Sequence, residues 1–265
     1  MTAANGEAMM QNDTSRVATG GKAVYGACLG ILMLDARFPR IPGDMGNATT
    51  WPFPVLYKVV PGATPERVVL QGATGLLDTF LEAAAELVHI GADGITTNCG
   101  FLSLYQADIA RHCRVPVATS SLMQVPFVQA LLPPGKRVGV LTVSARTLTP
   151  AHLAAAHVPL DTPIEGTDGG REFTRVLMGN IERLDGALAE QDILDAGDRL
   201  LKRAPDVGAI VLECTNMVPY ARALRRRLDL PVFDIYNFIS WFHAALSPRD
   251  FGPPGSAPGA HATIP

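Results

Sequence analysis

Two segments of the sequence place a cysteine directly after a short apolar run. The segments Gly94 to Gly100 and Ala209 to Asn216 each predict a strand that ends at the cysteine, Cys99 or Cys214, before a helix begins. The N–H groups at a helix start stabilise anions, including a thiolate and a bound carboxylate. Two such thiols are suited to removing a proton from one face of a bound carbon and returning one to the other.

The two cysteines belong to an internal repeat. Three landmarks recur in order, a Gly-Lys pair, the cysteine and a Pro-Val pair, at Lys22, Cys99 and Pro116 and again at Lys136, Cys214 and Pro231. The interval from cysteine to proline is the same in both halves. Duplicated α/β units bind ligands outside the carboxyl ends of their strands. We therefore expect the two thiols to face one another across a cleft between the halves.

The elements that must position these residues alternate along the chain. Strands are predicted at residues 24–34, 67–70, 94–97, 115–118, 137–143, 207–212 and 232–235, with a short one near Ile164, and helices at residues 75–90, 102–112, 122–132, 149–157, 185–203, 217–228 and 238–246. This alternation predicts an α/β fold of two pseudo-symmetric lobes with mostly parallel sheets, each flanked by helices.

The domain organisation follows from the repeat and from the composition of the two ends. One lobe is predicted to contain residues 22–114 together with 230–246, and the other residues 115–229. Residues 1–21 lack periodicity, and residues 247–265 are rich in Pro, Gly and Ala, so both are predicted to be disordered tails.

Composition narrows the functional class. The chain has 265 residues, of which 48% are hydrophobic and 18% charged, as expected for a globular protein of enzyme size. A net charge of −3 and the lack of a clustered basic surface predict no nucleic-acid partner. No apolar run reaches a membrane-spanning length, and the N-terminus lacks a signal-peptide core, so we expect no membrane association and a cytoplasmic location. The four cysteines have no metal-binding spacing, which predicts free thiols and no metal site.

The segment between residues 35 and 65 is unusual because it combines six prolines with aromatic residues. A long loop of this kind in a compact domain is often the wall or lid of a site. Its polar residues Asp44 and Asn47 either contact substrate or form a tight turn with the neighbouring glycines.

A thiol pair performs acid–base chemistry without a metal or cofactor, because a cysteine with an unperturbed pKa of about 8.5 is readily converted to a thiolate. The developing carbanion still needs stabilisation. Backbone N–H groups and the polar neighbours Asn98, Thr215 and Asn216 are candidates to bind the substrate carboxylate and spread its charge.

Cys99 after an apolar strand, the Glu213-Cys214-Thr215-Asn216 motif and the duplicated halves resemble the aspartate/glutamate racemase superfamily. The resemblance covers about residues 24–246. It implies two similar α/β lobes with the active site between them, no cofactor, Cys99 and Cys214 as the acid–base residues, and Gly100, Thr215 and Asn216 as carboxylate-binding residues. It is compatible with a homodimer, although no sequence feature marks an interface.

The same resemblance leaves the reaction open. The amino-acid racemases usually carry Asn-Thr after the first cysteine, whereas this chain has Gly100-Phe101, which favours a more apolar site or a different substituent on the substrate. We expect a racemase or epimerase acting on a small, amino-acid-like carboxylate. The alternatives are β-elimination like that of the related algal dimethylsulfoniopropionate lyases, cis-trans isomerisation, decarboxylation, and a silent small-molecule binder, for which a pair of cysteines has no use.

Overall fold

The computed structural model describes residues 18–251. The tails predicted at residues 1–21 and 247–265 lie outside this range except for residues 18–21 and 247–251, which form no helix or strand. The strands are β1 (Leu29–Leu34), β2 (Val55–Val60), β3 (Gly94–Thr97), β4 (Val117–Ala118), β5 (Arg137–Thr142), β6 (Ile164–Gly166), β7 (Val207–Leu212) and β8 (Val232–Phe233). The α-helices are α1 (Leu77–Ile90), α2 (Gln106–Cys113), α3 (Val125–Leu131), α4 (Pro150–Ala155), α5 (Phe173–Met178), α6 (Gly186–Arg203), α7 (Ala221–Leu228) and α8 (Ile235–Leu246).

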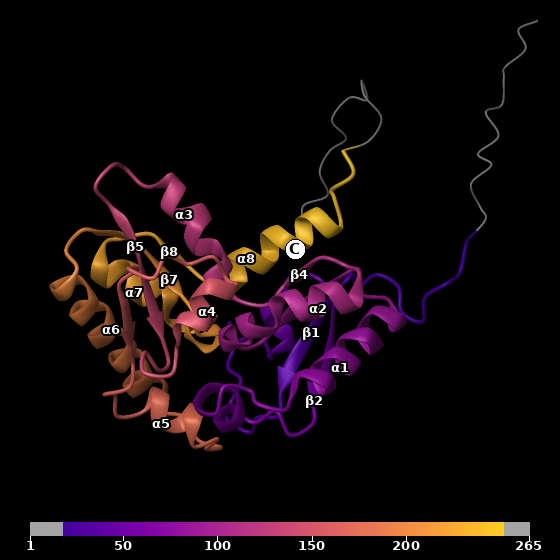
Figure 1. Cartoon of the computed structure of the whole chain (residues 1–265), viewed down its shortest axis with the longest axis horizontal. Helices are drawn as coiled ribbons and strands as arrows, with labels where there is room; N and C mark the ends of the chain where they lie inside the picture. The colour runs from indigo at the N-terminus through magenta and orange to yellow at the C-terminus, as the bar shows by residue number, and fades with distance from the viewer. Residues whose placement is uncertain (1–17, 252–265) are drawn as a thin grey trace, which may run out of the picture.

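The strands form two separate four-stranded sheets with the same topology. The first has the order β2-β1-β3-β4 and the second β6-β5-β7-β8, and every pairing is parallel. Each sheet forms the centre of one lobe, and the lobes lie side by side (Figure 1). The α/β fold with two sheets of parallel strands flanked by helices is therefore confirmed.

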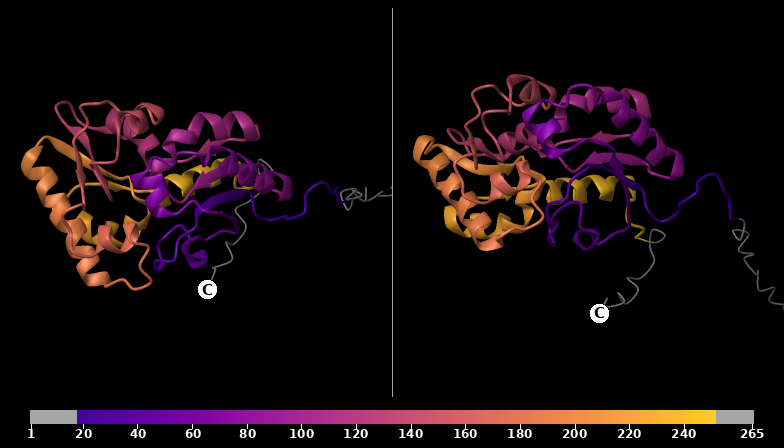
Figure 2. Two further views of the ribbon diagram at one scale, coloured as in Figure 1. Left: turned by 60° about the horizontal axis from the view of Figure 1, so that its bottom comes forward. Right: turned by 90° about the horizontal axis from the view of Figure 1, so that it is seen from below.

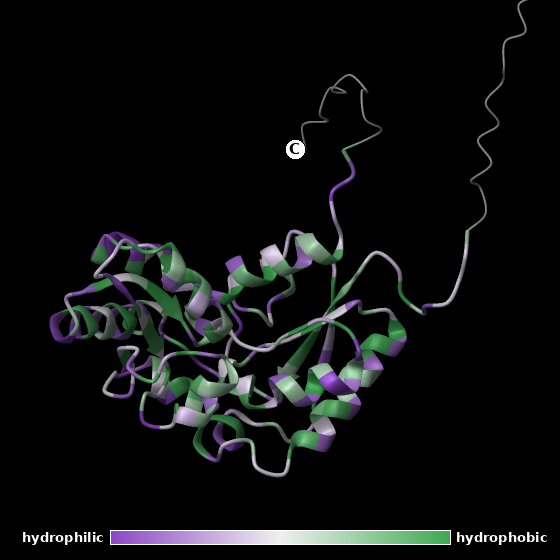
Figure 3. Ribbon diagram, turned by 45° about the horizontal axis from the view of Figure 1, so that its top comes forward, coloured by the Kyte–Doolittle hydropathy of each residue, from purple (hydrophilic) through white to green (hydrophobic). Residues whose placement is uncertain are grey.

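Both faces of the first sheet are buried, which explains the continuous apolar run of β1. Leu32 and Leu34 pack into the cluster that contains the α1 residues, whereas Ile31 and Met33 on the opposite face belong to a second cluster that includes Ile239 of α8. Hydrophobic residues are concentrated in the strands, and hydrophilic residues lie on the outward sides of the helices (Figure 3).

The two lobes exchange a helix. Helix α3 follows β4 of the first sheet but packs against β5 of the second, and α8 follows β8 of the second sheet but contacts β3 of the first. Helix α8 accordingly lies between the lobes and extends along the first one (Figures 1 and 2). The predicted division of the chain differs from the sheets at two strands, because residues 117–118 pair within the first sheet and residues 232–233 pair within the second.

Two local predictions are corrected by the structure. The segment expected to be a strand at residues 67–70 is a π-helical turn, η2 (Glu66–Leu70), closed by the Gln71 N–H bonding to the Glu66 carbonyl. The edge position that such a strand would need is taken by β2, which lies inside the segment expected to be a loop at residues 35–65. Prolines on both sides of β2 obscure it in the sequence, although prolines are tolerated beside an edge strand.

The remaining turns are short 3₁₀ helices: η1 (Ala48–Thr50), η3 (Gly100–Tyr105), η4 (Ser121–Gln124) and η5 (Thr215–Tyr220). The turns η3 and η5 are equally long and each leads into an eight-residue helix, α2 or α7. They show that the sequence repeat is also a structural repeat around the two cysteines.

Candidate active site

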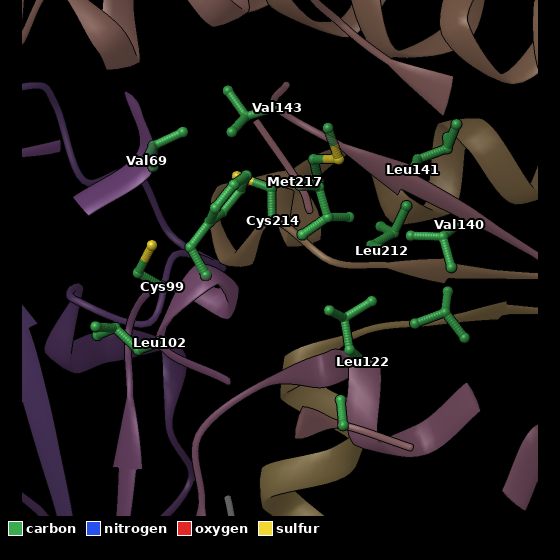
Figure 4. Packing of buried hydrophobic residues seen from close by; sticks show 14 of the residues in the cluster. Val69, Cys99, Leu102, Leu122, Val140, Leu141, Val143, Leu212, Cys214 and Met217 are labelled. Carbon is green, nitrogen blue, oxygen red and sulfur yellow. The ribbon is translucent and has the colours of Figure 1, made fainter. Parts of the chain in front are cut away.

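The two cysteines occupy equivalent positions in the two lobes. Cys99 follows β3 and precedes η3, and Cys214 follows β7 and precedes η5. Both thiols are buried, with 8% and 7% of the residue exposed. Figure 4 shows them in the region where Val69 of the first lobe approaches Val143 of the second.

A single cavity between the lobes contains both cysteines in its wall. It holds about 350 Å³ of empty space, counted with its open mouth. Polar groups are supplied by the two strand-end segments, residues 98–101 and 213–216. The rest of the lining is apolar and consists of Leu34, Phe38, Pro65, Val69, Val143, Leu177 and Met178.

Asn98 has a free donor at this cavity. Its Oδ1 accepts a 2.8 Å hydrogen bond from the Leu34 N–H, which fixes the orientation of the amide. Its Nδ2 is buried and has no partner among the described residues. A buried amide donor without a partner is unfavourable unless a ligand accepts from it. Asn98 is therefore well placed to bind an anion.

Thr215 lines the cavity, but its hydroxyl has a structural role. The Thr215 Oγ1 donates a 2.6 Å hydrogen bond to the Asn98 carbonyl and so links the two strand-end segments across the lobes. Thr215 can therefore contribute its backbone to substrate binding, while its hydroxyl hydrogen is already engaged.

Asn216 is held by the segment that contains Asp44. The Asn216 Nδ2 donates to Asp44 Oδ2, and its Oδ1 accepts from the Cys214 thiol at 3.7 Å. Asp44 is buried and also accepts from Arg40 Nη1 at 3.0 Å and from the Gly46 N–H at 2.7 Å. Asp44 is not among the residues that line the cavity, but it orients Asn216, which in turn accepts the hydrogen bond from the Cys214 thiol.

The structure does not bring Asn47 to the cavity. Its Nδ2 donates to the Arg40 carbonyl, and its Oδ1 caps η1 by accepting from the Thr49 N–H. Of the two roles expected for Asn47, substrate contact or a tight turn, the structure shows the turn.

Gly100 and Glu213 face one another across the lobes. A Cβ on Gly100 would lie 2.2 Å from Glu213 Oε1 and 2.5 Å from the Glu213 carbonyl oxygen. The Glu213 carboxyl thus occupies the space that a side chain at position 100 would need, which explains the glycine after Cys99.

Glu213 is the residue that sequence reasoning missed. It belongs to the motif around Cys214, but its partner lies in the other lobe, so the sequence alone predicts no role for it. In the structure it is fully buried in the cavity wall, and burial raises its pKa to about 7 although the hydrogen bond from Thr142 opposes the rise.

The two thiols differ in their surroundings. Burial raises the pKa of Cys99, the charge of Glu213 adds to the rise, and the result is about 12. Hydrogen bonds from the backbone N–H groups of Phe101 and Leu102, together with the charge of Arg40, act in the opposite direction. Burial and Glu213 also raise the pKa of Cys214 well above its usual value; the backbone N–H of Asn216 opposes that rise, but no cation of the described residues does.

Two further properties concern the described residues as a whole. Within residues 18–251, no group of three or more His, Cys, Asp or Glu side chains is arranged to hold a metal ion. No helix in that range is long and apolar enough to cross a membrane.

This chain is similar to one protein family and to several named enzymes. Residues 79–239 match the family described as Asp/Glu/hydantoin racemase. Dimethylsulfoniopropionate lyase 5 of Emiliania huxleyi is 32% identical over 82% of this chain, which spans 45% of that relative's length. Dimethylsulfoniopropionate lyase of Durusdinium sp. clade D is 28% identical over 82% of this chain and 74% of its own length.

The solved structures that resemble this chain share its fold. Arylmalonate decarboxylase matches with a TM-score of 0.56 at 18% identity, over 86% of this chain and 96% of its own. A glutamate racemase isoform of Bacillus anthracis also matches with a TM-score of 0.56, at 16% identity and over 83% of both chains.

Proposed function

Because the chain belongs to the Asp/Glu/hydantoin racemase family, we propose that it removes the α-proton of a small carboxylate and that the reaction is a β-elimination. The observation that carries this proposal is the single cavity that contains two thiols, a free amide donor and a largely apolar lining. The lyase alternative is preferred over racemisation because the curated relatives are named dimethylsulfoniopropionate lyases.

The proposed reaction balances without another reactant. The Cys99 thiolate takes a proton from the carbon next to the carboxylate. The electron pair left behind forms a double bond to the β-carbon while the bond from that carbon to sulfur breaks. For dimethylsulfoniopropionate the products are acrylate and neutral dimethyl sulfide, which leaves with the bonding pair, and Cys99 returns its proton to solvent.

The apolar lining favours a sulfonium group over an ammonium group. An ammonium group carries N–H donors, and burying them without acceptors is unfavourable. A sulfonium group has no such donors, so it fits against Leu34, Val69 and Met178 and against the face of an aromatic ring such as Phe101. Its positive charge would also lower the pKa of a nearby thiol, which compensates for the burial of Cys99.

The surroundings of the two thiols support different roles. Cys99 accepts hydrogen bonds from two backbone N–H groups and lies within the field of Arg40, and both stabilise a thiolate, whereas Cys214 has one such N–H group and, in the described part of the chain, no cation. Cys214 donates to Asn216, which Asp44 holds in place, and this arrangement keeps the Cys214 proton on sulfur. We therefore assign Cys99 as the base and Cys214 as a thiol that contacts the substrate and keeps its own proton.

The test is product formation from dimethylsulfoniopropionate. We expect dimethyl sulfide in the gas phase and an equal amount of acrylate in solution, both proportional to enzyme. The control is the Cys28→Ala variant, which changes a free cysteine outside the cavity lining and should keep wild-type turnover. Absence of both products at millimolar substrate would contradict the proposed elimination.

Racemisation is the second candidate, and the equivalent placement of two buried thiols favours it. A racemase working through both cysteines introduces solvent deuterium at the α-carbon of both enantiomers of its substrate. Incubation of aspartate and glutamate in deuterium oxide, followed by chiral chromatography, distinguishes it. Deuterium in both enantiomers, without release of dimethyl sulfide, would show that the enzyme is a racemase and not a lyase.

A further inference from the structure

Glu213 is a buried carboxyl that the proposed elimination does not yet use. Its Oε2 accepts a 2.7 Å hydrogen bond from Thr142 Oγ1. Its Oε1 is buried, has no partner among the described residues, and lies against Gly100 in the wall of the cavity. The protein therefore provides a hydrogen-bond partner for Oε2, and Oε1 is left to bond to a ligand.

An ionised Glu213 is poorly accommodated at this position. A buried carboxylate requires a cation or several donors, and the described structure gives Glu213 one neutral hydroxyl donor. Its negative charge would also oppose the formation of a thiolate at Cys99 and of a carbanion beside it. A neutral carboxylic acid avoids both problems and carries an O–H group that needs an acceptor.

We propose that Glu213 works as a neutral carboxylic acid whose Oε1 hydroxyl donates a hydrogen bond to the carboxylate of the substrate. Asn98 Nδ2, the other buried donor without a partner at this cavity, supplies the second hydrogen bond. The two donors come from equivalent positions in the two lobes, because each residue directly precedes one of the cysteines. The inference rests on the proposed function in that it takes the substrate to be a carboxylate.

The proposal makes anion binding dependent on pH. The pKa of Glu213 is raised to about 7, so the acid is neutral below this pH and must take up a proton to bind an anion above it. The other ionisable groups around the thiols are Cys99, Cys214, Arg40 and Asp44. The two thiols have pKa values raised far above this range, and Arg40 and Asp44 form an ion pair with each other.

The test is the binding of propionate, measured by titration calorimetry between pH 6 and pH 9, where propionate is an anion. For the wild type we expect binding to weaken by about tenfold for each pH unit above about 7, with uptake of one proton. The Glu213→Gln variant keeps a neutral donor, so its affinity at pH 6 should be within about threefold of wild type and should not change up to pH 9.

Two further variants complete the test. Glu213→Leu keeps the size of the side chain without a donor, so it should bind propionate at least tenfold more weakly at pH 6. Asp234→Asn is the matched control, because Asp234 is another buried acid whose pKa burial raises, to about 6, but it caps α8 outside the cavity lining. This control should reproduce the wild-type profile.

The outcomes separate this inference from the proposed function. Propionate binding that is independent of pH in the wild type, an unchanged pH slope in Glu213→Gln, or wild-type affinity in Glu213→Leu would each overturn the role of Glu213. Absence of propionate binding at every pH would overturn it as well. If the expected binding profile appears but dimethylsulfoniopropionate is not cleaved, the proposed elimination fails and the carboxylate site stands.

Discussion

Gly100 should be a residue at which a single added carbon disturbs the contact between the two lobes. The Gly100→Ala variant would place Cβ within 2.5 Å of both the side chain and the backbone of Glu213, so the two lobes must shift. We expect a loss of about 1–3 kcal/mol in the free energy of unfolding, the range for overpacking a close contact, together with loss of turnover. Urea denaturation measures the first effect. Gly169→Ala is the control, since a Cβ there meets no atom within 4 Å; equal stability of the two variants would contradict the contact.

For single residues, the sequence predicts the polar groups that lie next to a cysteine. It misses a residue such as Glu213, whose contact is made with the other lobe. Cys99, Cys214, Asn98 and Asn216 are adjacent to strand ends and could be identified by spacing. The role of Glu213 depends on its contact with Gly100, which is distant in sequence and becomes visible only when the two lobes are in place.

At the scale of elements, the segment between β1 and β2 should depend on one buried ion pair. Asp44 bonds to Arg40 and to Asn216, and it is 2% exposed. The Asp44→Ala variant would leave the charge of Arg40 buried without its partner, and we expect a loss of roughly 3 kcal/mol in the free energy of unfolding. Thermal and urea unfolding provide the measurement.

A surface pair gives the matched control for that variant. Lys58 and Glu86 also form an ion pair, but more than a third of each side chain is exposed. Glu86→Ala should therefore change the free energy of unfolding by less than about 1 kcal/mol. Similar losses in the two variants would show that the pair at Asp44 is not a buried support of the segment.

The sequence also predicts most helices and strands. It misses an edge strand, because such a strand lacks the regular apolar pattern of a central one. The long helices α1 and α6 and the central strands were expected because their apolar periodicity is regular. Strand β2 was missed because an edge strand flanked by prolines lacks that regularity. The helices after the cysteines begin with 3₁₀ turns, whose start is set by the strand end and not by a capping residue.

At the scale of the whole molecule, Glu213 should make stability depend on pH. Its pKa is about 7 in the folded protein and near 4.5 without burial, so the folded state binds more protons between these values and loses stability as the pH rises through them. Glu213→Gln should therefore be more stable than wild type at pH 8, by on the order of 3 kcal/mol. Below about pH 4.5 the difference should vanish. Urea unfolding across this pH range tests it, and parallel wild-type and variant curves would contradict a buried, neutral Glu213.

The two-lobe arrangement could be predicted because the repeat is visible in the chain, but the sheets that β4 and β8 join could not. Strands β4 and β8 each contain only two residues, too few to show by pattern which sheet they join. The placement of α3 and α8 follows from packing across the molecule, where α3 contacts β5 and α8 contacts β3.

The most direct test of the proposed chemistry is the rate of dimethyl sulfide release by Cys99→Ala and Cys214→Ala, measured side by side with saturating dimethylsulfoniopropionate. We expect Cys99→Ala to lose about 10²–10⁴-fold in turnover, the usual contribution of a general base, and Cys214→Ala to keep a larger share of activity. Native mass and circular dichroism confirm that both variants fold. Full turnover by Cys99→Ala would contradict the assignment of this thiol as the base.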